Sequence, residues 1–385
     1  MDFDEVIERR GTYCTQWDYI EDRFGKGTKD LTPFSISDMD FKSPQKVIDT
    51  IFERVSHGVF GYSRWNHSDY KSSIKDWYLK RYKTEIDEEW VVYSPTVLYS
   101  ISLVVELIAG AGGKVMTHTP RYDGFSKILS KYDLYEVKLT QKEDGIFYTD
   151  FDAIEAGFKK GVKVFLLCNP ENPTGKIWTE EELTKLIQLS KQYGVIIISD
   201  DIHMDIARKE VTPILKLDEK NSLIVSSPSK TFNIPSLGGS YALIPDKDLR
   251  EKFIEHIKNV DSLSSAPILG ILATMVAYNQ CEEWVDELNK YLTKNCELVV
   301  KELNGYKGLK AYMPEATYLM WIDFKDTGLA PKEFKEALIN IGKVAIMSGE
   351  NYGDPYKIRL NVGAPVSKIQ IGIEGIKRAV DYLKM

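Results

Sequence analysis

Residues 195–203 read VIIISDDIH, an apolar run that ends in two carboxylates and an imidazole. The run follows Gly194 and does not alternate polar with apolar residues, which is typical of a strand buried on both faces of a parallel sheet. Asp200 comes at its end, where a carboxylate is costly unless a polar or charged group pairs with it. The stretch therefore predicts a central strand with a functional group at its carboxyl end.

Similar β-branched runs alternate with helical patterns between about residues 90 and 260. A helix is expected over Thr179–Tyr193, where Thr179 and Glu182 have the spacing of a capping box. The expected strands are 91–94, 114–118, 163–168, 194–199, 222–226 and 240–244. This alternation predicts an α/β fold, with a mostly parallel sheet between two layers of helices.

The pattern changes after about Ser264. A long helical pattern runs toward Asn304, and the strand-like segments ATYLMWIDF (316–324) and KIRLNV (357–362) alternate with helices near 331–341 and from Ser367. Because 385 residues exceed the size of a single core, two domains are expected. We predict a large domain over residues 46–265, a smaller α+β domain over 266–385, and an N-terminal segment, 1–45, that packs with the small domain.

Composition narrows the class of protein. A net charge of −7 argues against a nucleic-acid groove, and no run of 18 apolar residues predicts a membrane span. The start, MDFDEVIERR, is acidic and unlike a secretory leader, so the cytoplasm is expected. The cysteines lack the C-x-x-C spacing of a zinc framework, which suits reduced thiols: Cys14, Cys168, Cys281 and Cys296.

Polar clusters follow four of the expected strands. Since ligands bind outside the carboxyl ends of strands in an open parallel sheet, these clusters are expected to converge. They are SPT at 94–96, CNPENPTG at 168–175, SDDIH at 199–203 and SSPSKTFN at 226–233.

The SDDIH cluster allows three interpretations. Asp200 suits a carboxylate that holds a cationic ring nitrogen, with His203 on the same side of a helical turn. Alternatively, Asp200 or Asp201 caps the next helix. A metal site of Asp200, His203 and Asp205 is a third interpretation, but the other strand ends carry Asn, Ser and Lys rather than the ligands of a hard metal.

Lys230 stands out by its setting among small hydroxyl residues at a strand end. A partly desolvated lysine there has a depressed pKa and becomes an amine nucleophile. Most lysines are instead solvated surface charges. Ser227 and Ser229 would offer neutral hydroxyl donors to an anion beside it.

The segments SPT and CNPENPTG each have a structural and a functional interpretation. Ser94 is expected to cap a helix with Pro95 at its first position, which leaves the amides of Thr96 and Val97 as a phosphate seat. An ordinary capped helix fits equally well. The Asn-Pro pairs predict a rigid turn, in which Asn172 serves either shape alone or as a fixed amide donor.

Taken together, NPENPTG, SDDIH, SPSKTFN and KIRLNVGAP resemble the fold-type I enzymes that use pyridoxal 5′-phosphate (PLP), the aspartate-aminotransferase superfamily, over nearly the whole chain. The segments SDMDF (37–41), GYS (61–63), SPTV (94–97) and TPRY (119–122) are most similar to its cystathionine β-lyase, or C–S lyase, branch. Plain aminotransferases more often have Tyr at the position of His203 and a phosphate-binding Arg at that of Gly238.

The resemblance implies a PLP-dependent transferase-like fold and a set of cofactor contacts. Lys230 would bond the cofactor, and Asp200 would pair with its pyridine N–H. Asn172 would donate to the ring 3′-oxygen beside His203, and Tyr122 would stack on the ring. The phosphate would lie on the amides of Thr96 and Val97 and the hydroxyls of Ser227 and Ser229.

The resemblance also implies how substrate and subunits are arranged. Arg359 would grip the substrate carboxylate with its planar fork. Tyr62 would reach the phosphate of the neighbouring subunit, so a homodimer with shared active sites is expected. The chain departs from the branch in two places, where Asp201 replaces a common Glu and Glu171 replaces a common His.

The implied activity is elimination at the β-carbon of an amino-acid substrate. Lys230 would remove the α-proton, and cystathionine, cysteine or another cysteine S-conjugate would yield pyruvate, ammonia and a thiol. A class I/II aminotransferase is the alternative, since it would use the same residues. A PLP-binding regulatory module is less favoured, because such domains usually follow a DNA-binding segment and here the matching region starts almost at Met1.

Overall fold

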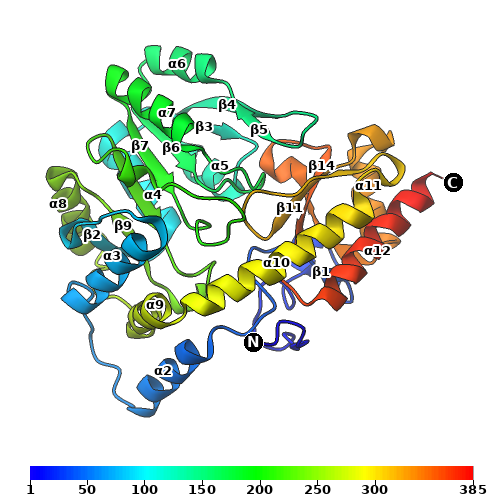
Figure 1. Ribbon diagram of the computed structural model, residues 1–385, viewed down its shortest axis with the longest axis horizontal. Helices are drawn as coiled ribbons and strands as arrows, with labels where there is room; N and C mark the ends of the chain where they lie inside the picture. The colour runs from blue at the N-terminus through cyan, green and yellow to red at the C-terminus, as the bar shows by residue number, and fades with distance from the viewer. Residues whose placement is uncertain (385) are drawn as a thin grey trace.

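A long central sheet separates two layers of helices in the larger part of the molecule (Figure 1). The computed structural model describes residues 1–384. Eight strands follow one another in the order β2-β9-β8-β7-β6-β3-β4-β5. Their bounds are β2 Val91–Ser94, β3 Lys114–Thr119, β4 Asp133–Gln141, β5 Phe147–Thr149, β6 Val164–Cys168, β7 Ile196–Asp200, β8 Ser222–Ser226 and β9 Ser240–Leu243.

Most neighbouring strands of this sheet are parallel. β8, β7, β6, β3 and β4 pair in parallel in that order, whereas β9 and β5 pair antiparallel with their neighbours. β6 and β8 are buried along their whole length, and β7 along nearly all of it, because helices cover both faces. The mostly parallel α/β sheet predicted from the sequence is confirmed.

Alternate strand residues enter two hydrophobic cores, one on each face of the sheet, because successive side chains of a strand point to opposite sides. Phe165 and Leu167 of β6 join the core under α3, α6, α7 and α9. Val164 and Leu166 join the core under α4, α5 and α8. The bounds of the helices around this sheet are α2 Gln45–Ser56, α3 Ser68–Tyr82, α4 Val97–Ala109, α5 Asp123–Leu129, α6 Phe151–Lys159, α7 Glu180–Tyr193, α8 Lys247–Glu255 and α9 Ile268–Gln280.

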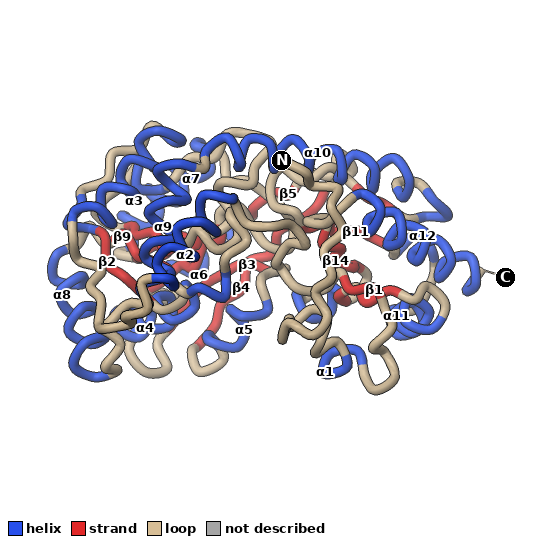
Figure 2. Tube along the Cα trace, turned by 90° about the horizontal axis from the view of Figure 1, so that it is seen from below, coloured by secondary structure: helices blue, strands red, loops and turns tan. Residues whose placement is uncertain are grey.

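A second, smaller sheet lies to one side of the first and runs in the order β10-β11-β14-β13 (Figure 2). All its neighbouring strands are antiparallel. The long helix α10 packs on α12, and α12 also packs on α11. The bounds are α10 Glu282–Leu303, β10 Lys310–Ala311, β11 Leu319–Asp323, α11 Pro331–Asn340, β13 Met347–Ser348, β14 Lys357–Asn361 and α12 Val366–Leu383.

The N-terminal segment contacts both parts of the molecule. Its strand β1 (Thr32–Pro33) pairs with β12 (Val344–Ala345), and Asn361 of β14 donates to the carbonyls of Ile36 and Asp38, both at 2.6 Å. From the turn after β8, Asn233 donates to the Met39 carbonyl at 2.8 Å. The short helix α1 (Glu21–Phe24) belongs to the same segment. The division at residues 45 and 265 stays a prediction.

The structure differs from the sequence expectation in one long helical pattern and in several strands. The helical pattern toward Asn304 is two helices, because the backbone leaves helical geometry at Cys281 between α9 and α10. α9 packs on α2 and α3 beside the large sheet. The strands β4 and β5 were not expected, although Val137 and Leu139 of β4 are buried and alternate with polar residues, as in a strand with one covered face.

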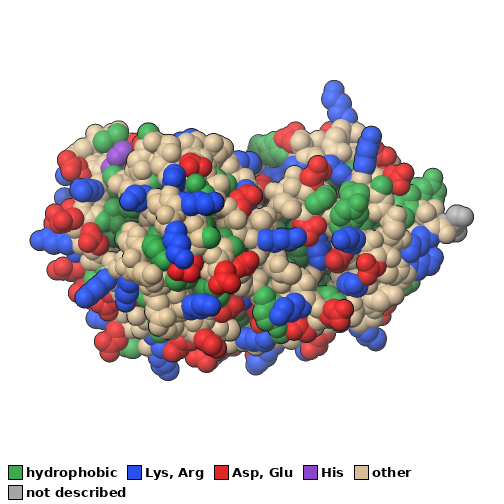
Figure 3. All heavy atoms as spheres, turned by 90° about the horizontal axis from the view of Figure 1, so that it is seen from above, with side chains coloured by type: hydrophobic (Ala, Val, Ile, Leu, Met, Phe, Trp, Pro, Cys, Tyr) green, Lys and Arg blue, Asp and Glu red, His purple; other side chains and the backbone are tan. Residues whose placement is uncertain are grey.

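None of the helices in residues 1–384 combines the length and apolar character that a membrane span requires. On the face that Figure 3 shows, acidic and basic side chains are interspersed.

Candidate active site

A cavity of about 810 Å³ lies at the carboxyl edge of the large sheet and reaches the small sheet at Arg359. Residues at or just after the ends of β2, β6, β7 and β8 line it, so the convergence predicted from the sequence is confirmed. Tyr62 lies outside the cavity and its side chain is fully exposed. The other ten candidate residues line the cavity: Thr96, Val97, Tyr122, Asn172, Asp200, His203, Ser227, Ser229, Lys230 and Arg359.

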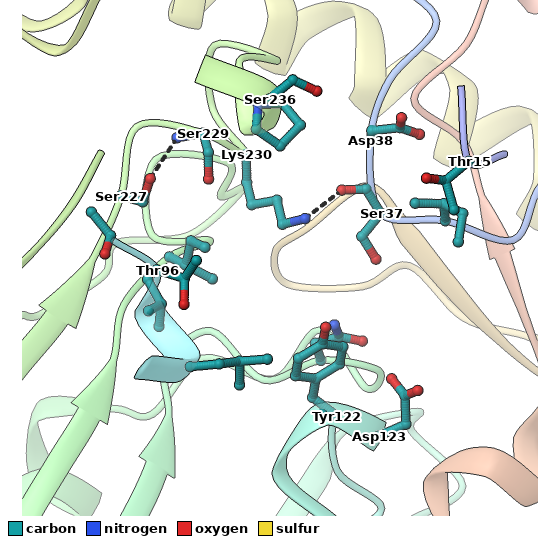
Figure 4. A pocket seen from close by; sticks show the side chains of 18 of the residues that line it. Thr15, Ser37, Asp38, Thr96, Tyr122, Asp123, Ser227, Ser229, Lys230 and Ser236 are labelled. Carbon is teal, nitrogen blue, oxygen red and sulfur yellow. Dashed lines mark hydrogen bonds between the residues drawn. The ribbon is translucent and has the colours of Figure 1, made fainter. Parts of the chain in front are cut away.

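Lys230 projects into this cavity from the turn after β8 (Figure 4). Its Nζ donates to the backbone carbonyl of Ser37, in the N-terminal segment, at 2.7 Å. Burial lowers the pKa of the amine below its usual range, although the nearby charge of Asp38 acts in the opposite direction. The setting therefore favours the neutral, nucleophilic form of the amine over that of a surface lysine.

Asp200 ends β7 inside the cavity and is almost completely buried. Its Oδ1 accepts a hydrogen bond from the Ile202 amide at 3.2 Å. Burial raises the pKa of the carboxyl to about 7, and the Ile202 amide and the Lys230 charge only partly oppose this rise. A carboxylate in this environment is suited to pair with an N–H of a cationic ring.

His203 directly follows Ile202 and is also buried. The segment 202–205 is a turn rather than the helix that the sequence analysis expected, so neither Asp200 nor Asp201 caps a helix there. Burial, together with the charges of Lys230 and Arg359, lowers the pKa of the imidazole to about 3, so the ring is neutral. Within residues 1–384 its Nδ1 has no hydrogen-bond partner, which leaves a polar atom free beside the cavity.

Arg359 of β14 reaches the cavity from the small sheet. Its guanidinium donates to Asn172 Oδ1 at 3.0 Å and to the Ser35 carbonyl at 2.7 Å, and it lies 4.6 Å from the ring centroid of Tyr352. These contacts fix the planar fork in place. They also orient Asn172, because its oxygen faces Arg359 and its amide N–H groups face away.

A set of neutral donors lies where β2 meets α4. Thr96, not Ser94, caps α4: its Oγ1 accepts from the Tyr99 amide at 3.1 Å, and Pro95 precedes the helix. Ser94 is instead the last residue of β2, and its hydroxyl donates to the Thr96 carbonyl. The amide of Val97 therefore lies at the open N-terminus of a helix, which favours an anion.

Ser227 and Ser229 lie on the other side of this helix end (Figure 4). The Ser227 hydroxyl donates to the Gly239 carbonyl at 2.9 Å and accepts from the Ser229 amide at 3.1 Å. Gly238 also lines the cavity, with a φ of 72°. The donors gathered here are thus hydroxyls and backbone amides, with a glycine where a basic side chain stands in many aminotransferases.

Sequence reasoning missed several residues of this site. It quoted SDMDF without a role, yet the Ser37 carbonyl holds Lys230, and Asp38 is held by Arg9 at 2.7 Å. It also missed Tyr352, which lines the cavity and whose ring lies against the Arg359 guanidinium. A backbone carbonyl has no residue-type signal, and no motif marks Tyr352.

The three candidate metal ligands do not converge. The Asp205 carboxylate accepts from Trp77 Nε1 at 2.9 Å, from the Tyr82 hydroxyl and from Thr231 Oγ1 at 2.8 Å, and so is fully engaged outside the cavity. Among residues 1–384, no group of three or more His, Cys, Asp or Glu side chains is placed to hold a metal ion.

The two departures from the branch pattern, Glu171 and Asp201, are both buried and do not line the cavity. Burial raises the pKa of each carboxyl well above its usual range, and the charge of Asp200 adds to both shifts. The Ser199 hydroxyl donates to Asp201. Both carboxyls therefore favour their neutral form behind the site.

Comparison with known proteins gives consistent matches along the chain. A family model described as aminotransferase class I and II matches residues 29–376. Protein MalY of Escherichia coli (strain K12) is 39% identical over 99% of this chain and 99% of its own. Cystathionine beta-lyase PatB of Bacillus subtilis (strain 168) is 32% identical over 99% of this chain and 100% of its own.

A solved structure extends the match to the fold. Cystalysin from Treponema denticola, whose structure contains a pyridoxal 5′-phosphate cofactor, has a TM-score of 0.93 to this chain. It is 29% identical, and the match covers 99% of both chains.

Proposed function

Because the chain belongs to the aminotransferase class I and II family, we propose that it is a PLP-dependent carbon–sulfur β-lyase. It would convert cysteine S-conjugates to pyruvate, ammonia and a thiol. The observation that carries this proposal is the meeting of Lys230, Asp200 and Arg359 in one cavity of a chain that matches PatB, a cystathionine beta-lyase, over its full length.

The residues of the cavity fit PLP. Asp200 is a buried carboxylate with only a backbone amide for a partner among the described residues, and the pyridine N–H of PLP would supply a second partner. The hydroxyls of Thr96 and Ser229 and the amide of Val97 suit a phosphate group. Lys230 offers a desolvated amine between these two ends.

Three further residues would position the ring. Asn172 would donate its free amide N–H to the ring 3′-oxygen, since Arg359 already holds its oxygen. His203 would lie beside it as a neutral imidazole with an unpartnered nitrogen. Tyr122, at the start of α5, would cover one face of the ring.

When bound, PLP supplies an electron sink for the bonds at the substrate α-carbon. The chain supplies the proton transfer and the orientation. Lys230 would remove the α-proton, and the lowered pKa of its amine increases the fraction present in the basic form. The Ser37 carbonyl, at 2.7 Å from Nζ, would hold that amine at a fixed position.

Arg359 would orient the substrate for this proton transfer. Its planar fork would bind the substrate carboxylate in bidentate fashion, and the Tyr352 ring and the Ser35 carbonyl hold the guanidinium rigid. The fixed carboxylate would place the α-hydrogen toward Lys230 and the β-substituent toward the mouth of the cavity.

Transamination is the second candidate, because the family is described by that reaction. It would use the same residues but would need a keto acid to complete each cycle. Incubating the purified protein with L-cystathionine separates the two reactions. Pyruvate formed in equal amount to the released thiol, with no keto acid added, supports the lyase, whereas turnover only with a keto acid overturns it.

We also propose a homodimer with shared active sites. Tyr62 is fully exposed and sits in a loop of exposed apolar residues after α2, including Val59 and Phe60. On α2 itself, Phe52 is 73% exposed. Figure 1 shows α2 projecting from the body of the large sheet. An exposed apolar surface of this kind marks a protein interface, and a partner seated there would bring Tyr62 to the phosphate end of its neighbour's cavity.

The cytoplasm is the proposed location, because all four cysteines are free thiols, as expected in a reducing compartment.

A further inference from the structure

Several charged side chains at the mouth of the active-site cavity have no role in the proposed reaction. Arg23, on α1, lines the cavity together with Asp123 and Lys127 of α5. The same three residues line an adjoining recess of about 710 Å³. The mouth therefore leads from the substrate site into a second space with charged walls.

Arg23 differs from the other two arginines of the cavity. Arg9 is held by Asp38 at 2.7 Å and Asp40 at 2.6 Å, and Arg359 is held by Asn172 and the Ser35 carbonyl. Arg23 is exposed to solvent, and within residues 1–384 its guanidinium has neither a salt bridge nor a hydrogen bond to the chain. A guanidinium at a cavity mouth with its donors free is suited to a carboxylate that arrives with a ligand.

Asp123 offers the opposite charge beside it. It is the first residue of α5, next to Tyr122, and Figure 4 shows its carboxylate at the cavity beside that ring. Its nearest cation is Lys127, with a gap of 3.7 Å between Nζ and Oδ2, and that lysine side chain is 79% exposed. The Asp123 carboxylate is thus only weakly paired and remains open to an ammonium group.

Two tyrosines connect these charges with the carboxylate clamp. The Arg359 guanidinium lies over the ring of Tyr352, 4.6 Å from its centroid, and Tyr122 lines the same cavity. Burial is the main cause of the raised pKa of both phenols. The charge of Asp123 also raises each pKa, whereas the charges of Arg359 and Arg23 lower it. Arg359, the two phenols, Arg23 and Asp123 therefore line one continuous cavity.

We propose that Arg23 and Asp123 form a subsite for a second amino-acid headgroup at the far end of the substrate. Arg23 binds the distal carboxylate and Asp123 binds the distal ammonium group. This inference rests on the proposed function and narrows it, because it selects cysteine thioethers that carry an amino acid on both sides of the sulfur. Cysteine itself and simple S-alkylcysteines reach only Arg359.

The test compares three substrates with the same reacting end. These are L-cystathionine, its deamino analogue without the distal ammonium group, and uncharged S-propyl-L-cysteine. Arg23→Gln is expected to lower the ratio of kcat/KM for L-cystathionine over that for S-propyl-L-cysteine about 10- to 100-fold, mainly through KM, as one charged hydrogen-bonded pair is lost. Asp123→Asn is expected to lower the preference for L-cystathionine over the deamino analogue about 10-fold.

Two variants control for charge and folding. Arg10→Gln makes the same change on the same segment at a residue that pairs with Glu8 and does not line the cavity, so it is expected to keep the ratio. Arg23→Lys keeps the charge without the planar fork and is expected to fall between wild type and Arg23→Gln. Equal losses for all three substrates in Arg23→Gln would overturn the subsite.

A binding measurement separates this subsite from the proposed reaction. The analogue of cystathionine with a methylene in place of sulfur has no thiolate to expel, and titrating it against the absorbance of the holoenzyme gives its dissociation constant. Arg23→Gln is expected to raise that constant about 10- to 100-fold, whether or not the wild type releases pyruvate. An unchanged constant in an active lyase overturns the subsite alone, and a raised constant without pyruvate release overturns the lyase alone.

Discussion

Asp200 is one residue whose burial affects both the stability of the protein and its proposed binding of the cofactor. In the cofactor-free protein its pKa is about 7, whereas an unfolded aspartate has a pKa of about 3.9. Between these pH values the folded protein binds a proton that the unfolded chain releases. The free energy of unfolding is therefore expected to fall as the pH rises through this range, with a contribution approaching about 1.4 kcal/mol per pH unit.

Asp200→Asn removes this contribution, because the amide does not titrate. Urea unfolding of the cofactor-free wild type and variant, between about pH 4 and about pH 7, is expected to show the smaller slope in the variant. With PLP bound, a pyridine N–H pairs with the carboxylate and holds it charged, so the wild-type slope is expected to shrink as well. The same slope in both cofactor-free proteins would contradict a carboxylate strained by burial.

Arg359→Lys tests the carboxylate clamp. The ammonium group of lysine lacks the planar fork that now contacts Asn172 and the Ser35 carbonyl. We expect KM for the amino-acid substrate to rise about 10- to 100-fold with a smaller change in kcat. The matched control is Arg378→Lys, since Arg378 donates to the Gly342 carbonyl at 2.7 Å far from the cavity. A KM that does not change in Arg359→Lys would remove Arg359 from substrate binding.

The sequence predicted ten residues of the cavity lining, several of them because polar residues stood directly after apolar strands, as at Asp200 and Lys230. It did not predict Ser37, because a carbonyl that accepts from Lys230 is a property of backbone position rather than of residue type. It also gave no reason to single out Arg23, whose position over the cavity depends on how the N-terminal segment returns to the large sheet.

Among the elements, the N-terminus of α4 has two roles: it is a capped helix end and the proposed binding site of the PLP phosphate. Thr96 Oγ1 accepts from the Tyr99 amide at 3.1 Å, and Thr179 Oγ1 of α7 accepts from the Glu182 amide at the same distance. Thr96→Val and Thr179→Val are both expected to lower the free energy of unfolding by about 1 kcal/mol. Only Thr96→Val is expected to weaken PLP binding, because only that residue lines the cavity.

Denaturant unfolding and a cofactor titration measure these two effects separately. Equal PLP affinity in wild type and Thr96→Val would show that the cap serves α4 alone. Weakened PLP binding in Thr179→Val would show instead that loss of stability, rather than loss of the hydroxyl, lowers affinity.

The same helix shows where sequence reasoning stops. Ser94 and Thr96 are both good capping residues, and the pattern favoured Ser94 because a proline followed it. In the structure Ser94 is paired with Ser240 of β9 across the sheet, so the strand runs on to Ser94 and the helix begins later. Tertiary pairing decided between two equivalent local signals.

At the scale of the whole molecule, the proposed dimer makes each active site depend on two chains. Mixed dimers of Lys230→Ala and Tyr62→Ala would contain one site with Lys230 and Tyr62 both intact. Unfolding and refolding the two inactive variants together is therefore expected to restore activity, to at most about half of the sites in each mixed dimer. Pyruvate release after co-refolding measures this.

A second mixture provides the control. Lys230→Ala with Asp200→Asn leaves no intact site, because both residues line the cavity of the same chain, so no activity is expected. Full activity of Tyr62→Ala on its own, or no recovery in the first mixture, would contradict a shared site.

One cavity, built from four strand ends and the small sheet, is proposed to hold PLP on Lys230. Borohydride reduction of the holoenzyme locks the cofactor onto the amine that carries it, and peptide mapping by mass spectrometry then locates it. The modified peptide is expected to be the one that contains Lys230, and Lys230→Ala is expected to yield no modified peptide. Cofactor found on another lysine, or none retained by the wild type, would contradict the account.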